Sequence, residues 1–158
     1  MDEDYRSYIV EKSKRYMQHI RSLNHSVRML EAEMDELRDM AAGLHGIDYS
    51  KPYVKSSPST DAIPNALARI ESIMAEYEAE LGEFLDEQHT AHVALRNVDA
   101  VYAELLSFRY VQGMPWADVA ARMHHAEDYV RKELHDDALA ALYPYIPHGW
   151  RDPIHRAI

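Results

Sequence analysis

The chain contains no cysteine, no run of about 18 apolar residues of the kind that spans a membrane, and no third in which basic residues outnumber acidic ones. The lack of cysteine excludes disulfide bonds, iron–sulfur clusters and thiolate chemistry, and it fits a reducing compartment. The acidic start, Met1 to Asp4, is unlike a secretory or transit peptide. We therefore expect a cytoplasmic protein that has no membrane partner.

The shortage of positive charge bears on nucleic-acid binding. The net charge of the 158 residues is −10, and the acidic excess extends over all three thirds of the chain. Contacts between cationic side chains and phosphates supply most of the non-specific affinity of a protein for DNA. Any binding to DNA must therefore come from a local basic patch.

Motifs of catalysis are also missing, since the sequence has no Walker loop, no G-x-G-x-x-G and no G-x-S-x-G. Carboxylate pairs such as Glu76 and Glu80 have the helical spacing of a solvated surface. His89 and His92, with carboxylates one turn earlier, could bind a divalent metal, but a polar outer helix surface is the commoner meaning of such a pattern. We expect no enzymatic activity, no catalytic residue, no metal and no cofactor.

An apolar repeat with alternating spacings of three and four residues runs through the first 44 residues. Such a 3.5-residue period is typical of a coiled-coil seam. Its members are Ile9, Ser13, Tyr16, Ile20, Leu23, Val27, Leu30, Met34, Leu37, Ala41 and Leu44.

A second seam of similar length follows, with Gln88 as its one polar position. Glycine, prolines and serines between about residues 45 and 61 predict a loop between the two helices. The sequence thus predicts a long antiparallel coiled-coil hairpin over residues 1–98, and its narrow buried face favours a homo-oligomer. The second seam comprises Ile63, Leu67, Ile70, Met74, Tyr77, Leu81, Phe84, Gln88, Ala91 and Leu95.

Residues 99–145 predict a different unit, made of three short helices. Gly113 suits a left-handed helix end, and Pro115 suits the first turn of the next helix. Two short helices joined by a tight turn, with a supporting helix before them, form a helix-turn-helix. The expected helices cover residues 100–111, 116–123 and about 127–142, and an aromatic, proline-containing tail of residues 146–158 is expected to fold back over them.

The third of these helices is expected to leave one face open to solvent. Arg131 and Lys132 on this face could reach base edges or phosphates. Glu127 and Asp128 stabilise the helix N-terminus but repel phosphates. The open face is predicted to comprise Glu127, Asp128, Arg131, Lys132 and His135, with Tyr129 at its edge and His124 and His125 in the preceding turn.

The run LLSFRYVQGMPWADVAARM, followed by YVRKELHDDALAAL, resembles region 4 of sigma-70 factors. It resembles more closely the small phage-encoded transcriptional regulators of the ArpU and RinA type and related uncharacterised phage proteins. The close resemblance covers about 45 residues of the sequence. The matching positions are Leu106, Arg109, Tyr110, Gly113, Trp116, Val119, Ala120, His135, Ala138, Leu139 and Leu142.

The resemblance implies a phage or prophage transcriptional regulator that binds double-stranded DNA, with a weaker implication of contact with RNA polymerase. The chain departs from the family pattern at Ala126, Glu127 and Asp128, where relatives carry a serine or threonine cap and a less acidic helix start. The DNA-reading positions that the resemblance implies are His125, Tyr129, Arg131, Lys132 and His135.

Two other functions stay open at this stage. The acidic surface and long seams also suit a protein-interaction or scaffolding protein. A helix-turn-helix joined to a coiled coil also occurs in small terminase subunits, which bind DNA for packaging. Self-assembly into rings would be evidence for the packaging function.

Overall fold

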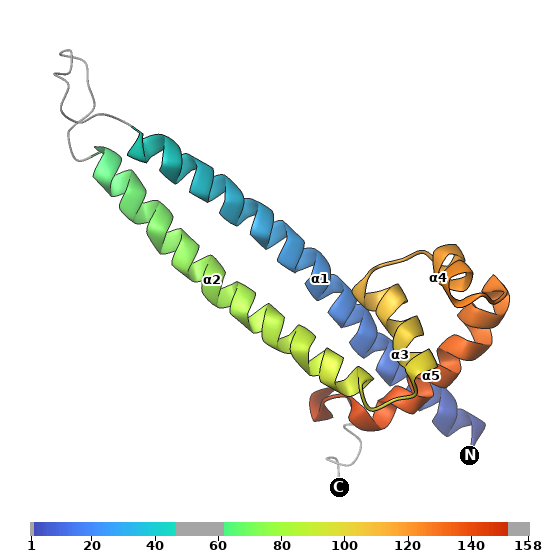
Figure 1. Cartoon of the computed structure of the whole chain (residues 1–158). Coiled ribbons are helices and arrows are strands. Elements are labelled where there is room, and N and C mark those ends of the chain that lie inside the picture. The colour runs from blue at the N-terminus through green and yellow to red at the C-terminus, as the bar shows by residue number, and fades with distance from the viewer. Residues whose placement is uncertain (1, 47–61, 152–158) are drawn as a thin grey trace, which may run out of the picture. The chain divides into compact units, whose positions relative to one another are not determined.

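The computed structural model describes residues 2–46 and 62–151, and all regular secondary structure in these ranges is helical (Figure 1). The predicted all-α fold is therefore confirmed. Most of the expected loop at residues 45–61 and the end of the tail, residues 152–158, lie outside the described residues. No helix in the described ranges is long and apolar enough to cross a membrane.

Two long helices form the first part of the chain. Helix α1 extends over Glu3–His45, and helix α2 extends over Ala62–Leu95. Two acidic residues in the first turn of α1 stabilise its N-terminus through the helix dipole. Both helices lack an internal proline beyond the first turn, so nothing in their sequences breaks the backbone hydrogen-bond ladder.

The contacts divide the chain into two compact units, and both long helices run through the division. The first unit comprises residues 1–25 and 86–158, and the second comprises residues 26–85. This division differs from the boundary near residue 98 that the sequence suggests. The reason is that the C-terminal helices pack on the beginning of α1, which a linear division of the sequence assigns to the hairpin alone.

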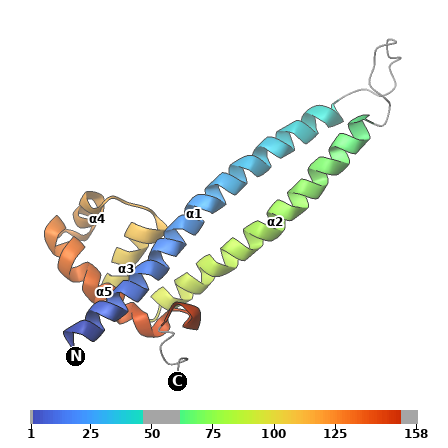
Figure 2. The same ribbon diagram turned by 180° about the vertical axis from the view of Figure 1, so that it is seen from behind.

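In the second unit, α1 and α2 lie side by side and run in opposite directions in both views (Figures 1 and 2). Val27, Leu30 and Met34 of α1 are buried, as is Ile70 of α2. The remaining seam positions of α2 in this unit stay partly exposed: Ile63, Leu67, Met74, Tyr77, Leu81 and Phe84. The α2 side of the seam therefore keeps apolar surface in contact with water.

The first unit contains the C-terminal helices, and all three predicted helices are present. The first is α3, Ala100–Leu106, which continues into the π-helical segment η1, Ser107–Val111. The second is α4, Trp116–Met123. In the third, two helical residues lead into the π-helical segment η2, Tyr129–Leu134, and then into α5, His135–Leu142.

The turns around α4 follow the expected chemistry. Gly113 has a φ of +71°, in the left-handed region that glycine adopts without steric cost. Pro115 is the residue that caps the N-terminus of α4, one position before the predicted first turn. At the other end, His124 caps α4 with a φ of 59°, which is uncommon for a residue with a Cβ.

Apolar side chains from α3, α4 and α5 form the core of the first unit. Val119, Leu139 and Leu142 are fully buried in it, together with Leu105 and Leu106. Val101, near the start of α3, is 49% exposed. The end of α3, rather than its start, therefore contributes side chains to the core.

The tail folds back onto α1, as far as it is described. A short 3₁₀ turn, Tyr143–Tyr145, leads into the tail, which forms a second 3₁₀ turn, His148–Trp150. Ile146 is fully buried, and the Trp150 ring lies 5.7 Å from that of Tyr16 and 4.9 Å from that of His19. The tail thus adds an apolar anchor and an aromatic contact to the first unit.

Candidate nucleic-acid interface

A buried asparagine of α1 holds the end of η1. The Nδ2 group of Asn24 donates hydrogen bonds to the carbonyl oxygens of Tyr110 at 3.1 Å and Val111 at 2.9 Å. The last carbonyl groups of a helix have no partner within the helix, so Asn24 supplies one from another element. Gln88 of α2 donates in turn to the Oδ1 of Asn24, which gives the one polar position of the α2 seam a structural role.

A second set of contacts joins η1, α4 and α5. The hydroxyl of Tyr110 lies 2.7 Å from the Nε2 of His135, and both side chains are buried. The Trp116 ring meets the His135 ring edge to face at 4.6 Å. Arg109 lies over Trp116 at 4.7 Å and donates to the carbonyl oxygen of Met114 at 2.9 Å, which fixes the turn that precedes α4.

Positive charge surrounds these buried groups. Burial, together with the nearby charges of Lys14 and Arg109, lowers the pKa of His135 from 6.5 to about 4. Burial and the nearby charge of Arg21 lower the pKa of Arg109. Burial raises the pKa of Tyr110 to about 12. His135 is thus neutral at pH 7, and the cationic side chains that act on it and on Arg109 are Lys14, Arg109 and Arg21.

These cations surround a hollow of about 520 Å³ in the first unit, which we call the basic hollow. The N-terminal part of α1, η1, α4, η2 and α5 all contribute to its lining, and five of the lining side chains are cationic against one carboxylate. The lining residues are Lys14, Gln18, Arg21, Arg109, Tyr110, Trp116, Arg131, Lys132, His135 and Asp136. A chain of net charge −10 therefore concentrates positive charge at one place.

Five of the six residues predicted to bind DNA are exposed to solvent. Arg131 and Lys132 line the basic hollow, and the Nη2 of Arg131 lies 3.0 Å from the Oδ1 of Asp128. His124 and His125 lie in the turn that follows α4, and Tyr129 lies shortly after this turn. The rings of His125 and Tyr129 are 5.3 Å apart.

The sixth residue corrects the sequence prediction. The sequence predicts His135 on the open face of the third helix, but its side chain is only 5% exposed. The cause is the π-helical segment before it, in which the backbone N–H of His135 donates to the carbonyl oxygen of Val130, five residues earlier. One extra residue in the turn rotates the rest of the helix by about 100° relative to a regular α-helix. This rotation separates the exposed face of Arg131 and Lys132 from the core face, on which His135 lies three, four and seven residues before the buried Ala138, Leu139 and Leu142.

Sequence reasoning also missed residues that the fold adds to the site. Lys14 and Arg21 of α1 line the basic hollow, and Gln18 lies between them on the same helix face. Their spacing of four and three residues shows in the sequence that they share a face. No local signal places that face beside Arg131, because the approach of α1 to η2 is a long-range contact.

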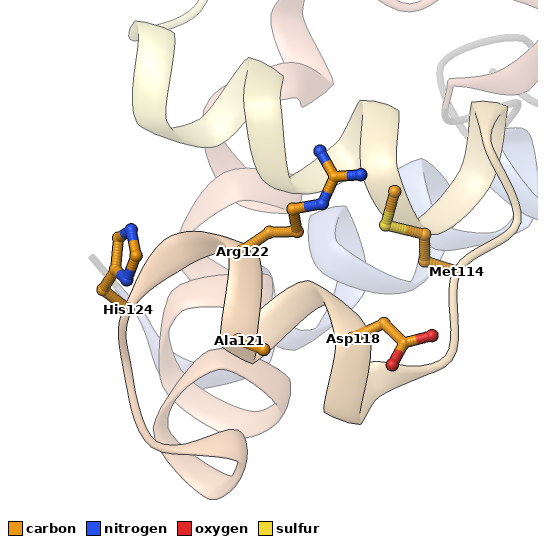
Figure 3. Close-up of a pocket in the computed structure, with 5 residues that line it drawn as sticks. All are labelled: Met114, Asp118, Ala121, Arg122 and His124. Atoms are coloured by element: carbon orange, nitrogen blue, oxygen red, sulfur yellow. The ribbon is translucent and has the colours of Figure 1, made fainter.

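A second hollow, of about 430 Å³, lies against α4 (Figure 3). One acid, Asp118, and one base, Arg122, line it together with Met114, Ala121 and His124. The guanidinium carbon of Arg122 lies 5.8 Å from the centre of the Phe108 ring. With one acidic and one basic side chain, this α4 hollow has no excess of positive charge, so the basic hollow is the stronger candidate for binding an anion.

The chain matches no family model, no curated protein and no solved structure.

Proposed function

We propose that the protein is a transcriptional regulator that binds double-stranded DNA through its first unit. The observation that carries the proposal is the basic hollow, where α1 brings Lys14 and Arg21 beside the exposed Arg131 and Lys132. Binding to DNA phosphates requires basic residues gathered on one surface, and no such patch is visible in the sequence alone.

The proposal assigns different tasks to the residues of this surface. Arg131 and Lys132 contact base edges or phosphates, and Lys14 and Arg21 contact the phosphate backbone. His124, His125 and Tyr129 contact the adjacent backbone from the turn and the helix start. His135 does not touch DNA in this proposal, and instead it fixes the orientation of η2 through Tyr110.

A homo-oligomer is part of the proposal, with the second unit as the contact between copies. The support is the partly exposed apolar seam of α2, together with the exposed Met29, Met40 and Leu85. Burial of such surface between two copies is favourable, and two DNA-binding units acting together bind more tightly than one. Sedimentation equilibrium of the purified protein gives the number of copies directly.

The resemblance to phage-encoded regulators supports a role in transcription, in the cytoplasm, with RNA polymerase as a candidate second partner. The alternative function is that of an acidic interaction or DNA-packaging protein without a transcriptional role. The acidic excess of the chain and the exposed apolar residues of the second unit favour this alternative. Assembly of the protein into rings that bind a packaging motor would show that it acts in DNA packaging and not in transcription.

The test is fluorescence anisotropy with labelled duplexes from the protein's own genomic neighbourhood, measured over a range of salt concentrations. We expect one fragment to bind tightly, with affinity that falls as salt rises. The Arg131→Ala/Lys132→Ala variant should bind at least about tenfold more weakly. The matched control is Arg38→Ala/Arg69→Ala, which removes the same charge from the second unit and should bind like the wild type. No binding at low salt would overturn the proposal.

A further inference from the structure

We propose that the basic hollow is a binding site for a phosphate-bearing ligand that carries at least two negative charges. The phosphate can belong to a free phosphorylated molecule or to the backbone of DNA. The proposal shares Arg131 and Lys132 with the proposed DNA surface, but it does not rest on DNA binding, because it requires only the chemistry of a phosphate group.

The first argument is the number of unneutralised charges. Five cationic side chains line the basic hollow, and Asp136 is the single carboxylate in the lining. Arg131 forms an ion pair with Asp128. Among the described residues, no carboxylate lies within ion-pair distance of Lys14, Arg21 or Lys132. An anion in the hollow would meet charges that the protein itself does not neutralise.

The second argument is electrostatic strain. Burial is the largest cause of the lowered pKa of both Arg109 and His135, and the charge of Arg21 lowers the pKa of Arg109 as the charges of Lys14 and Arg109 lower that of His135. Like charges that are partly removed from water repel one another more strongly than on an open surface. A bound phosphate with two or more negative charges relieves this repulsion, and the neutral His135 adds none.

The third argument is that the donors are held in place. The guanidinium group of Arg109 is fixed by the Met114 carbonyl oxygen and by the Trp116 ring. Arg131 is restrained by Asp128 on the same helix. Guanidinium groups match phosphate oxygens with paired N–H donors, and restraint before binding lowers the entropy cost. A volume of about 520 Å³ also lies within the range of small-molecule sites.

The experiment is isothermal titration calorimetry of the full-length protein with inorganic pyrophosphate in a buffer of low ionic strength. We expect saturable binding by the wild type. Lys14→Gln/Arg21→Gln, which removes two lining charges of α1, should weaken binding by about tenfold or more. The control is Arg15→Gln/Arg28→Gln, which removes the same charge from the same helix at exposed positions outside the lining. Its affinity should stay within about twofold of the wild type.

Two results would overturn the proposal: no saturable binding of pyrophosphate, or equal loss of affinity in both double variants. Circular dichroism of each variant checks that the helices remain folded. The source of the phosphate is found by repeating the DNA titration with pyrophosphate present. Competition identifies the DNA backbone as an occupant of the hollow, whereas independent binding identifies a free ligand. If no DNA binds at all, the pyrophosphate result still stands by itself.

Discussion

The phenol of Tyr110 and the imidazole of His135 form a buried pair, with 2.7 Å between the hydroxyl oxygen and Nε2. His135 also has a hydrogen bond to the backbone of Arg131. A neutral imidazole has one donor and one acceptor nitrogen, so one ring serves both partners. The pair thus joins η1 to α5 and fixes the helix that carries Arg131 and Lys132.

Removal of the Tyr110 hydroxyl should destabilise the first unit. Tyr110→Phe leaves a ring nitrogen of His135 buried without its partner, which costs about 1–3 kcal/mol of the free energy of unfolding. Urea unfolding followed by circular dichroism measures this loss. Tyr145→Phe is the matched control, because Tyr145 is 45% exposed and its hydroxyl group is free to bond to water. An equal effect of the two substitutions would contradict the role of the pair.

The stability of the protein should fall as the pH is lowered through the range between the two pKa values of His135. The unfolded chain binds a proton with the ordinary pKa of 6.5, whereas the folded chain does so only at about 4. The unfolded state therefore binds more protons than the folded state between these pH values. The contribution of His135 to the free energy of unfolding is complete above about pH 6.5 and is lost progressively as the pH falls toward 4. From pH 8 to pH 5 we expect a loss of about 2 kcal/mol from this group.

Carboxylates titrate in part of the same range, so a variant must isolate the histidine. His135→Gln keeps hydrogen-bonding groups but has no proton to gain in this range. Its unfolding free energy should be lower than that of the wild type at pH 8 and should change less between pH 8 and pH 5. Equal pH dependence in the two proteins would show that His135 is not the titrating group.

Asn24 should be more important for stability than the seam residue that contacts it. Asn24→Ala removes the donor from the carbonyl oxygens of Tyr110 and Val111, and we expect a loss of about 2–3 kcal/mol. Gln88→Ala removes only the contact to Asn24, and the partly exposed site admits water, so the loss should be about 1 kcal/mol. Thermal unfolding of both variants tests this order, and the reverse order would refute it.

Two glycine substitutions should have effects of opposite sign. Gly113→Ala places a side chain at a φ of +71°, which costs roughly 1–2 kcal/mol although no atom lies within 4 Å of the added Cβ. Gly82→Ala in the middle of α2 also meets no atom within 4 Å, and it should stabilise the helix by about 0.5–1 kcal/mol. Chemical denaturation of both variants measures the two changes in the free energy of unfolding. Since neither added Cβ meets another atom, a difference in sign reports the backbone strain at Gly113.

The tail should contribute to stability through its aromatic contact with α1. Trp150→Ala removes the ring that packs on Tyr16 and His19, with an expected loss of about 1–3 kcal/mol. Tyr145→Ala removes an exposed ring nearby and should cost less than about 1 kcal/mol. A melting temperature that Trp150→Ala leaves unchanged would show that the tail does not stabilise the first unit.

The sequence predicted the positions of the helices more accurately than the burial of individual side chains. The apolar periods and the turn residues Gly113 and Pro115 placed α4 at its observed residues, because these signals are local. The π-helical segment changes the register before His135, so the exposed face of Arg131 and Lys132 does not continue to it. The spacing of three, four and seven residues to the buried Ala138, Leu139 and Leu142 is the signal that places His135 in the core. His135 thus belongs to the core and not to the DNA-contacting group.

The candidate site shows the same division between local and long-range information. Arg131 and Lys132 were found because they share a short helix with an apolar opposite face. Lys14, Arg21 and Asn24 were not found, because nothing local indicates that residues near the start of the chain contact residues more than 80 positions later. The basic patch that the net charge made doubtful exists only once the chain is folded.

The first unit is discontinuous in the sequence, which sets an order for its formation during synthesis. Residues 1–25 leave the ribosome well before residues 86–158, their packing partners, have been made. Until then Tyr16, Met17 and Ile20, all buried in the finished protein, have no core to join. Early pairing of residues 26–45 with 62–85 would bring the two parts together and shorten the loop that must close. Residues 1–25 therefore depend on helices made much later in synthesis to cover their apolar surface.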